Sequence, residues 1–196
     1  MRDNNTYHVS LRFLDFGEYA RSRRKVYELA KSEIDTLAFE TEESASLLVE
    51  EDGVGVYIYN TQGDDAIPLD TRPGKHVPLH ATALGKAILA YLPESKTESI
   101  FDRRELSAQT VKTITDPVEL RAELEMIREQ GYAVDDEERV RGVRCIAVAI
   151  KNENGQVIGA ISVSGPASRL DDDLRERLLK NLRRAKNIIE LKLTHT

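Results

Sequence analysis

The feature that most constrains the fold is a short turn between two runs of strand-forming residues. The segment SASLLVEEDGVGVYIYN (44–60) places Asp52-Gly53 between runs rich in β-branched and aromatic residues. An Asp-Gly pair in that setting predicts a β-hairpin, because glycine tolerates the positive φ that tight hairpin turns require. Two strands joined by so short a turn must be antiparallel, since parallel strands need a long crossover.

A second pair of strand-like runs lies near the C-terminus. VRCIAVAI (143–150) and QVIGAISVSG (156–165) flank a turn-forming segment and predict another hairpin. Two shorter segments, AIPLD (66–70) and YAVDD (132–136), are also expected to be strands. Because Pro68 cannot donate a backbone hydrogen bond, we expect AIPLD at an edge of the sheet.

Helical patterns fill most of the remaining chain. Apolar residues recur at helical spacing over 16–39 and 84–92, and a short helix is expected after Pro93. Asp116-Pro117 marks the start of another helix, and a last one is expected over about 171–193. Strands and helices do not alternate, so the sequence predicts an α+β fold in which helices cover a six-stranded antiparallel sheet.

The C-terminal hairpin has one face made of small side chains. With a four-residue turn at 152–155, Cys145 lies opposite Ser162 and Val143 lies opposite Ser164. A solvated face would carry larger polar or charged residues. The space above this face must therefore be filled by a closely packed helix or by a ligand, and the pattern leaves both open.

The segment VPLHATALGKAILAYLP (77–93) is rich in small residues and has no acidic one. Its Gly-Lys pair is not a Walker loop, because His80 replaces the first glycine and Ala87 the final Ser or Thr. The apolar spacing predicts an amphipathic helix ended by Pro93. Small residues over 81–85 would leave the N–H groups of the first helical turn accessible to an anion such as a carboxylate.

Composition excludes several classes of protein. The 196 residues carry a net charge of −6, so the chain alone is expected to bind nucleic acid poorly. A single cysteine excludes an internal disulfide and any metal site built on several thiolates. No apolar run approaches the roughly 18 residues of a membrane span, and no signal peptide is evident. We expect a cytoplasmic protein without membrane association, cofactor or metal.

Three blocks of the sequence, residues 78–93, 131–150 and 159–170, carry a family resemblance. PLHATALGKAILAYLP, GYAVDDEERVRGVRCIAVAI and GAISVSGPASRL closely resemble, in order and spacing, the effector-binding domain of IclR-type transcription regulators. The resemblance covers nearly the whole chain from Phe16 on. It implies a GAF-like fold with a curved six-stranded antiparallel sheet, a pocket for small organic acids, and assembly into dimers or tetramers.

The resemblance also implies which residues bind the effector. They are Leu69, Val77, Thr82, Ala83, Leu84, Asp135, Val143, Cys145, Ser162 and Ser164. Leu69 and Val77 would form the wall, and backbone N–H groups near Ala83 and Leu84 would meet the ligand. Some relatives have Ser-Gly where this chain has Thr82-Ala83, which would make the helix entrance slightly tighter here.

The resemblance suggests two regions. Residues 1–38 are expected to form a linker helix region, and residues 39–196 an effector-binding domain. In the family, a winged helix-turn-helix domain precedes the linker and binds operator DNA. Too few residues precede Phe16 to form it, so the chain is either cut from a longer regulator or a natural stand-alone domain. We favour the first, because YHVSLRFLDFGEYARSRRK (7–25) resembles the family's linker helix.

Three other functions can be argued from the residues. Cys145 with His80 and Asp135 would suit a hydrolase, but a nucleophilic cysteine normally sits at a helix start or beside a cation, and Cys145 lies mid-strand. His76 with the same three residues could bind a metal, although the spacing matches no recognised ligand pattern. A GAF-type sensor of cyclic nucleotides would need basic or aromatic pocket residues, which the small-residue face lacks.

Overall fold

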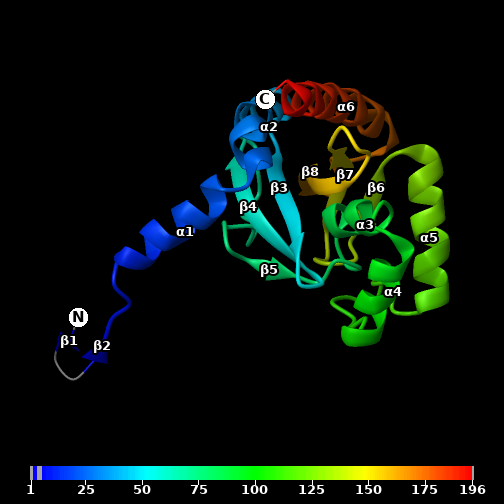
Figure 1. Ribbon diagram of the computed structural model, residues 1–196. Helices are drawn as coiled ribbons and strands as arrows, with labels where there is room; N and C mark the ends of the chain where they lie inside the picture. The colour runs from blue at the N-terminus through cyan, green and yellow to red at the C-terminus, as the bar shows by residue number, and fades with distance from the viewer. Residues whose placement is uncertain (1, 4–5, 196) are drawn as a thin grey trace.

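A six-stranded antiparallel sheet covered by helices on both faces forms the body of the protein (Figure 1). The computed structural model describes residues 2–3 and 6–195. Its helices are α1 (Arg12–Ser22), α2 (Lys25–Thr41), α3 (Ala83–Leu89), α4 (Glu94–Arg103), α5 (Pro117–Gln130) and α6 (Asp172–Thr194). Its strands are β1 (Arg2–Asp3), β2 (Thr6–Tyr7), β3 (Ser44–Glu51), β4 (Val54–Gln62), β5 (His76–Val77), β6 (Ala133–Asp136), β7 (Val143–Lys151) and β8 (Val157–Pro166).

The sheet has the strand order β5-β4-β3-β8-β7-β6, with every neighbouring pair antiparallel. The predicted α+β class and six-stranded antiparallel sheet are confirmed. The two hairpins, β3–β4 and β7–β8, meet at the centre of the sheet through the β3–β8 pair. The N-terminal and C-terminal parts of the chain therefore contribute one half of the sheet each.

Two apolar cores lie on opposite faces of the sheet. Alternate residues of the strands, such as Leu47 and Ile161, pack with α2 and α6. The opposite face, including Leu48 and Ala160, packs with α3, α4 and α5. Figure 1 shows these helix groups on the two sides of the strands. The second face is the one that carries the small side chains.

The predicted pairing within the C-terminal hairpin is wrong by two residues. Cys145 lies opposite Ser164, and Ala147 lies opposite Ser162. The turn has five residues rather than four, and a bulge at Ile158 adds one more residue to β8. Because the total shift is two, each side chain stays on its predicted face and only its partner changes.

The predicted edge strand is also wrong. Residues 66–70 form no strand, and the edge of the sheet is instead β5, in which His76 pairs with Val56. Pro68 lacks the N–H that pairing would use, and the chain passes through a turn at 72–75 before it pairs with β4 as β5. The sheet still has six strands, because β5 forms the edge strand next to β4.

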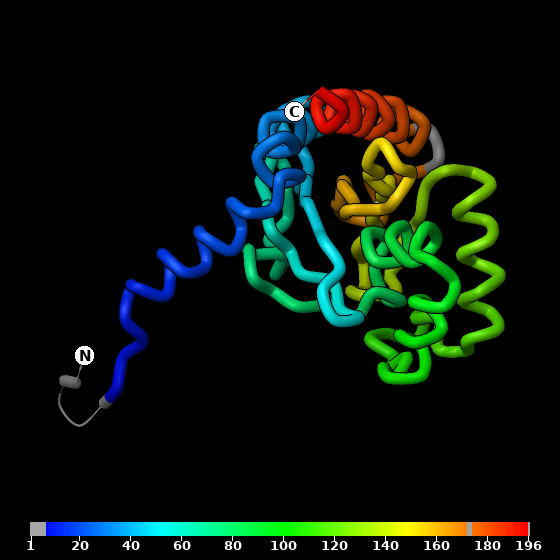
Figure 2. Tube along the Cα trace, viewed as in Figure 1, coloured from blue at the N-terminus to red at the C-terminus, as the bar shows by residue number. Residues whose placement is uncertain are grey.

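The N-terminal helical region is divided in two. The single helix expected over 16–39 breaks at Arg24, whose backbone is extended. Arg21 and Lys25 would stand one turn apart in a continuous helix, where like charges repel. α1 has no buried residue and extends away from the body in Figures 1 and 2, whereas α2 packs on the sheet. The expected linker region (1–38) therefore includes part of the packed domain, and its residues 1, 4 and 5 lie outside the described residues.

Helix α3 is shorter and more buried than predicted. It ends at Leu89 rather than near Pro93, and all seven of its residues are buried, so it is not amphipathic. A side chain at Gly85 would place its Cβ 2.1 Å from the Leu79 carbonyl oxygen. Glycine at this position lets α3 lie directly against the chain that leads into it.

Candidate functional site

Polar side chains of three neighbouring strands share the sheet face that α3 covers. We call this set the serine face; its members are Ser44 and Ser46 of β3, Cys145 of β7, and Ser162 and Ser164 of β8. Ser164 lies between Ser44 and Cys145, and Ser162 lies between Ser46 and Ala147. β6 adds Asp135, which pairs with Cys145. Pairing across the centre of the sheet thus brings both halves of the chain to one surface.

Two hydroxyls of the serine face are buried without a hydrogen-bond partner among the described residues. They are the Oγ atoms of Ser44 and Ser162, and both side chains are fully buried. Ser46, by contrast, accepts a hydrogen bond from Asn60 Nδ2 at 3.0 Å. A buried polar group without a partner costs about 1–3 kcal/mol. A bound molecule that supplied partners would remove that cost.

The start of α3 stands against this face. Thr82 caps the helix, with its Oγ1 accepting from the Gly85 N–H at 2.9 Å. The first intrahelical bond runs from the Lys86 N–H to the Thr82 carbonyl. The N–H groups of Ala83 and Leu84 come before it and have no acceptor within the helix. Ala83 and Leu84 belong to the same apolar core as Cys145.

Asp135 is buried at the edge of the serine face. Its Oδ1 accepts from the backbone N–H groups of Glu138 (2.7 Å) and Arg139 (3.3 Å). Burial, and next the charge of Glu138, raise the pKa of Asp135 to about 7. Near neutral pH the carboxyl group can therefore either donate a hydrogen bond or accept one.

The other expected pocket residues lie around this region. Val77 is buried in the apolar core that contains Leu84, and Val143 lies two residues before Cys145 at the start of β7. Leu69 is half-buried in the segment between β4 and β5, where its carbonyl accepts from the Thr71 N–H at 2.9 Å. The structure thus groups Asp135, Cys145, Ser162 and Ser164 closely, and sets Leu69 on a loop.

Comparison with known proteins identifies the family. The sequence model described as "Bacterial transcriptional regulator IclR C-terminal" matches residues 19–190. The chain belongs to the IclR family. The family expected from the three sequence blocks is therefore confirmed.

Individual IclR-family proteins resemble the chain over most of its length. "Probable HTH-type transcriptional regulator ArcR" of Halobacterium salinarum is 34% identical over 97% of this chain and 74% of its own length. The crystal structure of Thermotoga maritima IclR has a TM-score of 0.90 at 32% identity, over 98% of this chain and 78% of that one. The PobR inducer binding domain from Acinetobacter has a TM-score of 0.76 at 26% identity, over 83% of this chain and 96% of that one.

Cys145 of this IclR-family chain has the wrong environment for a nucleophile. The thiol is buried, and burial, followed by the charge of Asp135, raises its pKa to about 12. A reactive cysteine needs the opposite shift, because the thiolate is the nucleophile. His80 lies elsewhere, with Nε2 donating to the Ser107 carbonyl at 3.1 Å. The thiolate that a hydrolase needs is therefore disfavoured at Cys145, and His80, the expected base, is hydrogen-bonded to Ser107 instead.

The residues considered as metal ligands are also dispersed. His76 is exposed, and its Nδ1 lies 3.0 Å from the Gly74 carbonyl oxygen. Within residues 2–3 and 6–195, no three His, Cys, Asp or Glu side chains are grouped so that they could hold an ion.

In the same part of the chain, no helix is both long and apolar enough to cross a membrane.

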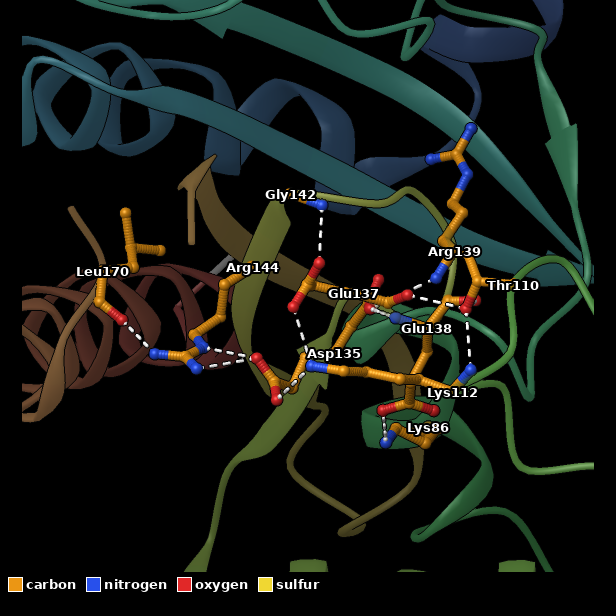
Figure 3. A network of polar contacts seen from close by, with 11 residues as sticks. Lys86, Thr110, Lys112, Asp135, Glu137, Glu138, Arg139, Gly142, Arg144 and Leu170 are labelled. Atoms are coloured by element: carbon orange, nitrogen blue, oxygen red, sulfur yellow. Dashed lines mark hydrogen bonds and ion pairs between the residues drawn. The ribbon is translucent and has the colours of Figure 1, made fainter. Parts of the chain in front are cut away.

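Sequence reasoning missed a buried lysine beside the site. Lys86 of α3 is only 1% exposed, and its ammonium contacts Glu123 of α5 at 2.9 Å and Glu138 at 2.5 Å. Figure 3 shows Lys86 against the Glu138 carboxylate. One signal was available: a lysine in a segment otherwise made of small and apolar residues requires carboxylate partners if the segment is buried.

It also missed Tyr57 and Arg139, which bring an aromatic ring and a cation to the region. Arg139 Nη1 donates to Tyr57 Oη at 2.7 Å, and the guanidinium lies 5.4 Å from the centre of the ring. Tyr57 comes from β4 and Arg139 from the segment after β6, so only the folded chain shows that they meet. The region around the serine face therefore has more polar groups than the C-terminal hairpin alone provides.

Proposed function

We propose that this chain is the ligand-sensing domain of a DNA-binding transcription regulator, and that it binds a small organic acid over the serine face. The observation that carries the proposal is the buried Ser162 hydroxyl, which has no partner among the described residues and shares its sheet face with Ser164 and Cys145. A hydroxyl in that state is available to a ligand oxygen. A regulator that reaches DNA acts in the cytoplasm, and the proposal includes that location and no catalytic role.

One solved relative supports an acid as the ligand. That structure is of a double mutant of the PobR inducer binding domain in complex with 3-hydroxybenzoic acid, which joins a carboxylate to a hydroxyl group. In our proposal the carboxylate of the effector meets the N–H groups of Ala83 and Leu84. Its other polar end lies toward Asp135, Ser162 and Ser164.

The remaining pocket residues have supporting roles in this proposal. Leu69, Val77 and Val143 contact the apolar part of the effector, and Thr82 holds the start of α3 in place through its cap. Cys145 is a small neutral group beneath the ligand. Its raised pKa keeps the thiol protonated, so it does not repel an anion.

Titration calorimetry with a panel of small keto, hydroxy and aromatic acids tests the proposal. Ser162→Ala should weaken binding of a confirmed acid by about tenfold or more, since a hydrogen bond to a charged group contributes about 1.5–3 kcal/mol. Folding should be nearly unchanged, because the hydroxyl has no partner to lose. Ala83→Glu should abolish binding by filling the helix entrance and repelling the anion.

Two results would reject the proposal. Parent-like binding by both variants would place the ligand elsewhere and make the small-residue face ordinary helix–sheet packing. Preferential binding of cyclic nucleotides from the same panel would favour a GAF-type nucleotide sensor instead, for which Tyr57 and Arg139 are suitable residue types.

We also propose that the domain mediates dimer or tetramer formation. Large apolar side chains are exposed along α1 and just before it: Val9, Leu11, Phe13, Leu14, Phe16 and Tyr19. Contiguous exposed apolar surface of this kind favours association. A regulator that reads a two-fold operator needs matching protein symmetry. Sedimentation that found only monomers at high micromolar concentration would contradict this.

A further inference from the structure

Arg139 holds two separate segments together beside the serine face. Its Nη1 donates to Tyr57 Oη at 2.7 Å, and its Nη2 donates to the Asp70 carbonyl oxygen at 3.1 Å. Its own backbone N–H donates to Asp135 at 3.3 Å, which fixes the residue beside the site. In Figure 3 the Arg139 side chain points away from Glu137 and Lys112, and so leaves the neighbouring carboxylate network.

Among the described residues, some arginines, such as Arg104, donate only to uncharged acceptors, and Arg139 is one of them. Arg121, Arg144 and Arg169 each pair with a carboxylate. In the part of the chain that the structure describes, the Arg139 side chain donates only to a phenol and a carbonyl, both of them uncharged. A guanidinium has five N–H donors in a planar fork that matches a carboxylate. These two bonds leave guanidinium donors for an incoming anion.

Tyr57 directs this cation toward the serine face. The ring is buried in the same apolar core as Cys145, and burial, the largest cause, raises the pKa of its phenol. Arg139, which donates to this phenol, also donates its backbone N–H to Asp135 at the edge of the serine face. Because the phenol oxygen accepts from Arg139, its own hydrogen is free to donate to a ligand.

The nearby lysine cannot take this role. The Lys86 ammonium is fully buried between Glu123 and Glu138, both within ion-pair distance. Arg139 is therefore the cation that remains to meet an anion entering beside Asp135. The half-buried position of Arg139 strengthens such an interaction relative to one in open solvent.

We propose that Arg139 and Tyr57 form a second anion subsite, so that the effector is a small diacid with a carboxylate at each end. This inference rests on the proposed function and deepens it. One carboxylate lies toward Ala83 and Ser162, and the other forms paired hydrogen bonds with the Arg139 guanidinium and one with the Tyr57 hydroxyl. Arg139 is then the residue that selects diacids over acids with a neutral second end.

Matched pairs of ligands test the selection directly. Calorimetry would compare malonate with malonamate, succinate with succinamate, and glutarate with glutaramate, in which an amide replaces one carboxylate at nearly constant size. The parent should bind at least one diacid about tenfold or more tightly than its amide partner, because charge-assisted bidentate bonds exceed neutral ones. Arg139→Gln should reduce that ratio to about one, and Arg139→Lys should keep part of it.

Two further variants complete the design. Arg141→Gln removes the same charge from an exposed position two residues away, and should keep the parent ratio. Tyr57→Phe keeps the ring and removes the hydroxyl, and should lower the ratio in part. Thermal unfolding of each variant checks that the fold is retained.

The outcomes separate this inference from the proposed function. Tight binding of acids with no preference for diacids, or a preference that survives Arg139→Gln, overturns the second subsite and leaves the sensing function standing. An equal loss of preference in Arg141→Gln also overturns it, because the effect would then be one of overall charge. If the parent binds no acid from either panel, both proposals fail.

Discussion

Lys86 and Glu138 form an ion pair at 2.5 Å in which both side chains are less than 9% exposed. The pair joins α3 to the segment that follows β6, and Glu123 of α5 provides the second carboxylate at 2.9 Å. A buried ion pair adds little net stability over an apolar pair, but removing one partner is costly. The contact therefore fixes the position of α3 relative to Asp135.

Lys86→Met should lower the free energy of unfolding by about 3–5 kcal/mol at pH 8, because the buried carboxylate of Glu138 and the half-buried one of Glu123 lose their cation. Urea denaturation would measure the change. The double variant Lys86→Met/Glu138→Gln should recover part of the loss. Arg121→Met, which breaks an exposed pair with Glu98, should cost less than about 1 kcal/mol. A Lys86→Met variant as stable as the parent would show that the ammonium does not hold α3.

Asp135→Asn should change how stability depends on pH. Aspartate in an unfolded chain titrates near about 3.9, whereas the pKa of Asp135 in the folded protein is raised to about 7, chiefly by burial. Between these values the folded state binds the additional proton, so the unfolding free energy falls as the pH rises from about 4 to 7. Charged neighbours that set this titration are Glu138, Lys86 and Arg139.

Urea unfolding of parent and Asp135→Asn at several pH values between 4.5 and 8 would check this. In Asp135→Asn, the fall of the unfolding free energy between about pH 4 and 7 should become smaller. Asp136→Asn is the control: burial there is outweighed by bonds from Arg144 and Lys112, which together lower its pKa. Its effect should appear only at lower pH, with the opposite sign. Identical slopes for parent and Asp135→Asn would contradict the raised pKa.

Gly85→Ala should destabilise the protein by about 1–3 kcal/mol or more, the range for overpacking a core. The added Cβ would lie 2.1 Å from the Leu79 carbonyl oxygen and 2.4 Å from its Cα, and backbone atoms cannot move aside easily. Gly17→Ala in α1 is the matched control, since it meets nothing within 4 Å. It should stabilise the helix by about 0.5–1 kcal/mol. Thermal unfolding would distinguish the two, and equal effects would refute the close approach.

The Cys145 thiol should react slowly with iodoacetamide at pH 8. With its pKa raised to about 12 by burial, almost none is present as thiolate, so the rate should be at least about a hundredfold below that of a free cysteine peptide. Because it is the only cysteine, total alkylation reports this site alone. Unfolding in urea should restore normal reactivity. Rapid alkylation of the folded protein would revive the hydrolase hypothesis.

The sequence predicted those parts of the fold that depend on local signals. The Asp52-Gly53 turn forms as expected, with both residues at positive φ, and Asp116 caps α5 through the Val118 N–H. Side chains alternate between the faces as predicted, because that alternation survives a register shift of two residues. The grouping of Cys145 with Ser162 on one face could therefore be found without the structure.

Long-range features could not be predicted in this way. The bulge at Ile158 depends on how β8 fits β7 and has no signature in the sequence. The burial of Lys86 depends on α5, and the contact of Arg139 with Tyr57 depends on β4 and the segment after β6, which come from different halves of the chain. The spacing of apolar residues therefore did not reveal side chains whose roles depend on partners distant in the sequence.

The central β3–β8 pair determines when the serine face can form during folding. Ser44 pairs with Ser164 and Ser46 with Ser162, so the serine face combines residues from early and late parts of the chain. Closing so long a loop is entropically unfavourable, and pairing of this kind slows folding. During synthesis, β3 must wait for β8 to emerge from the ribosome. The serine face, and with it the proposed effector site, therefore cannot form in a nascent chain until β8 has been made.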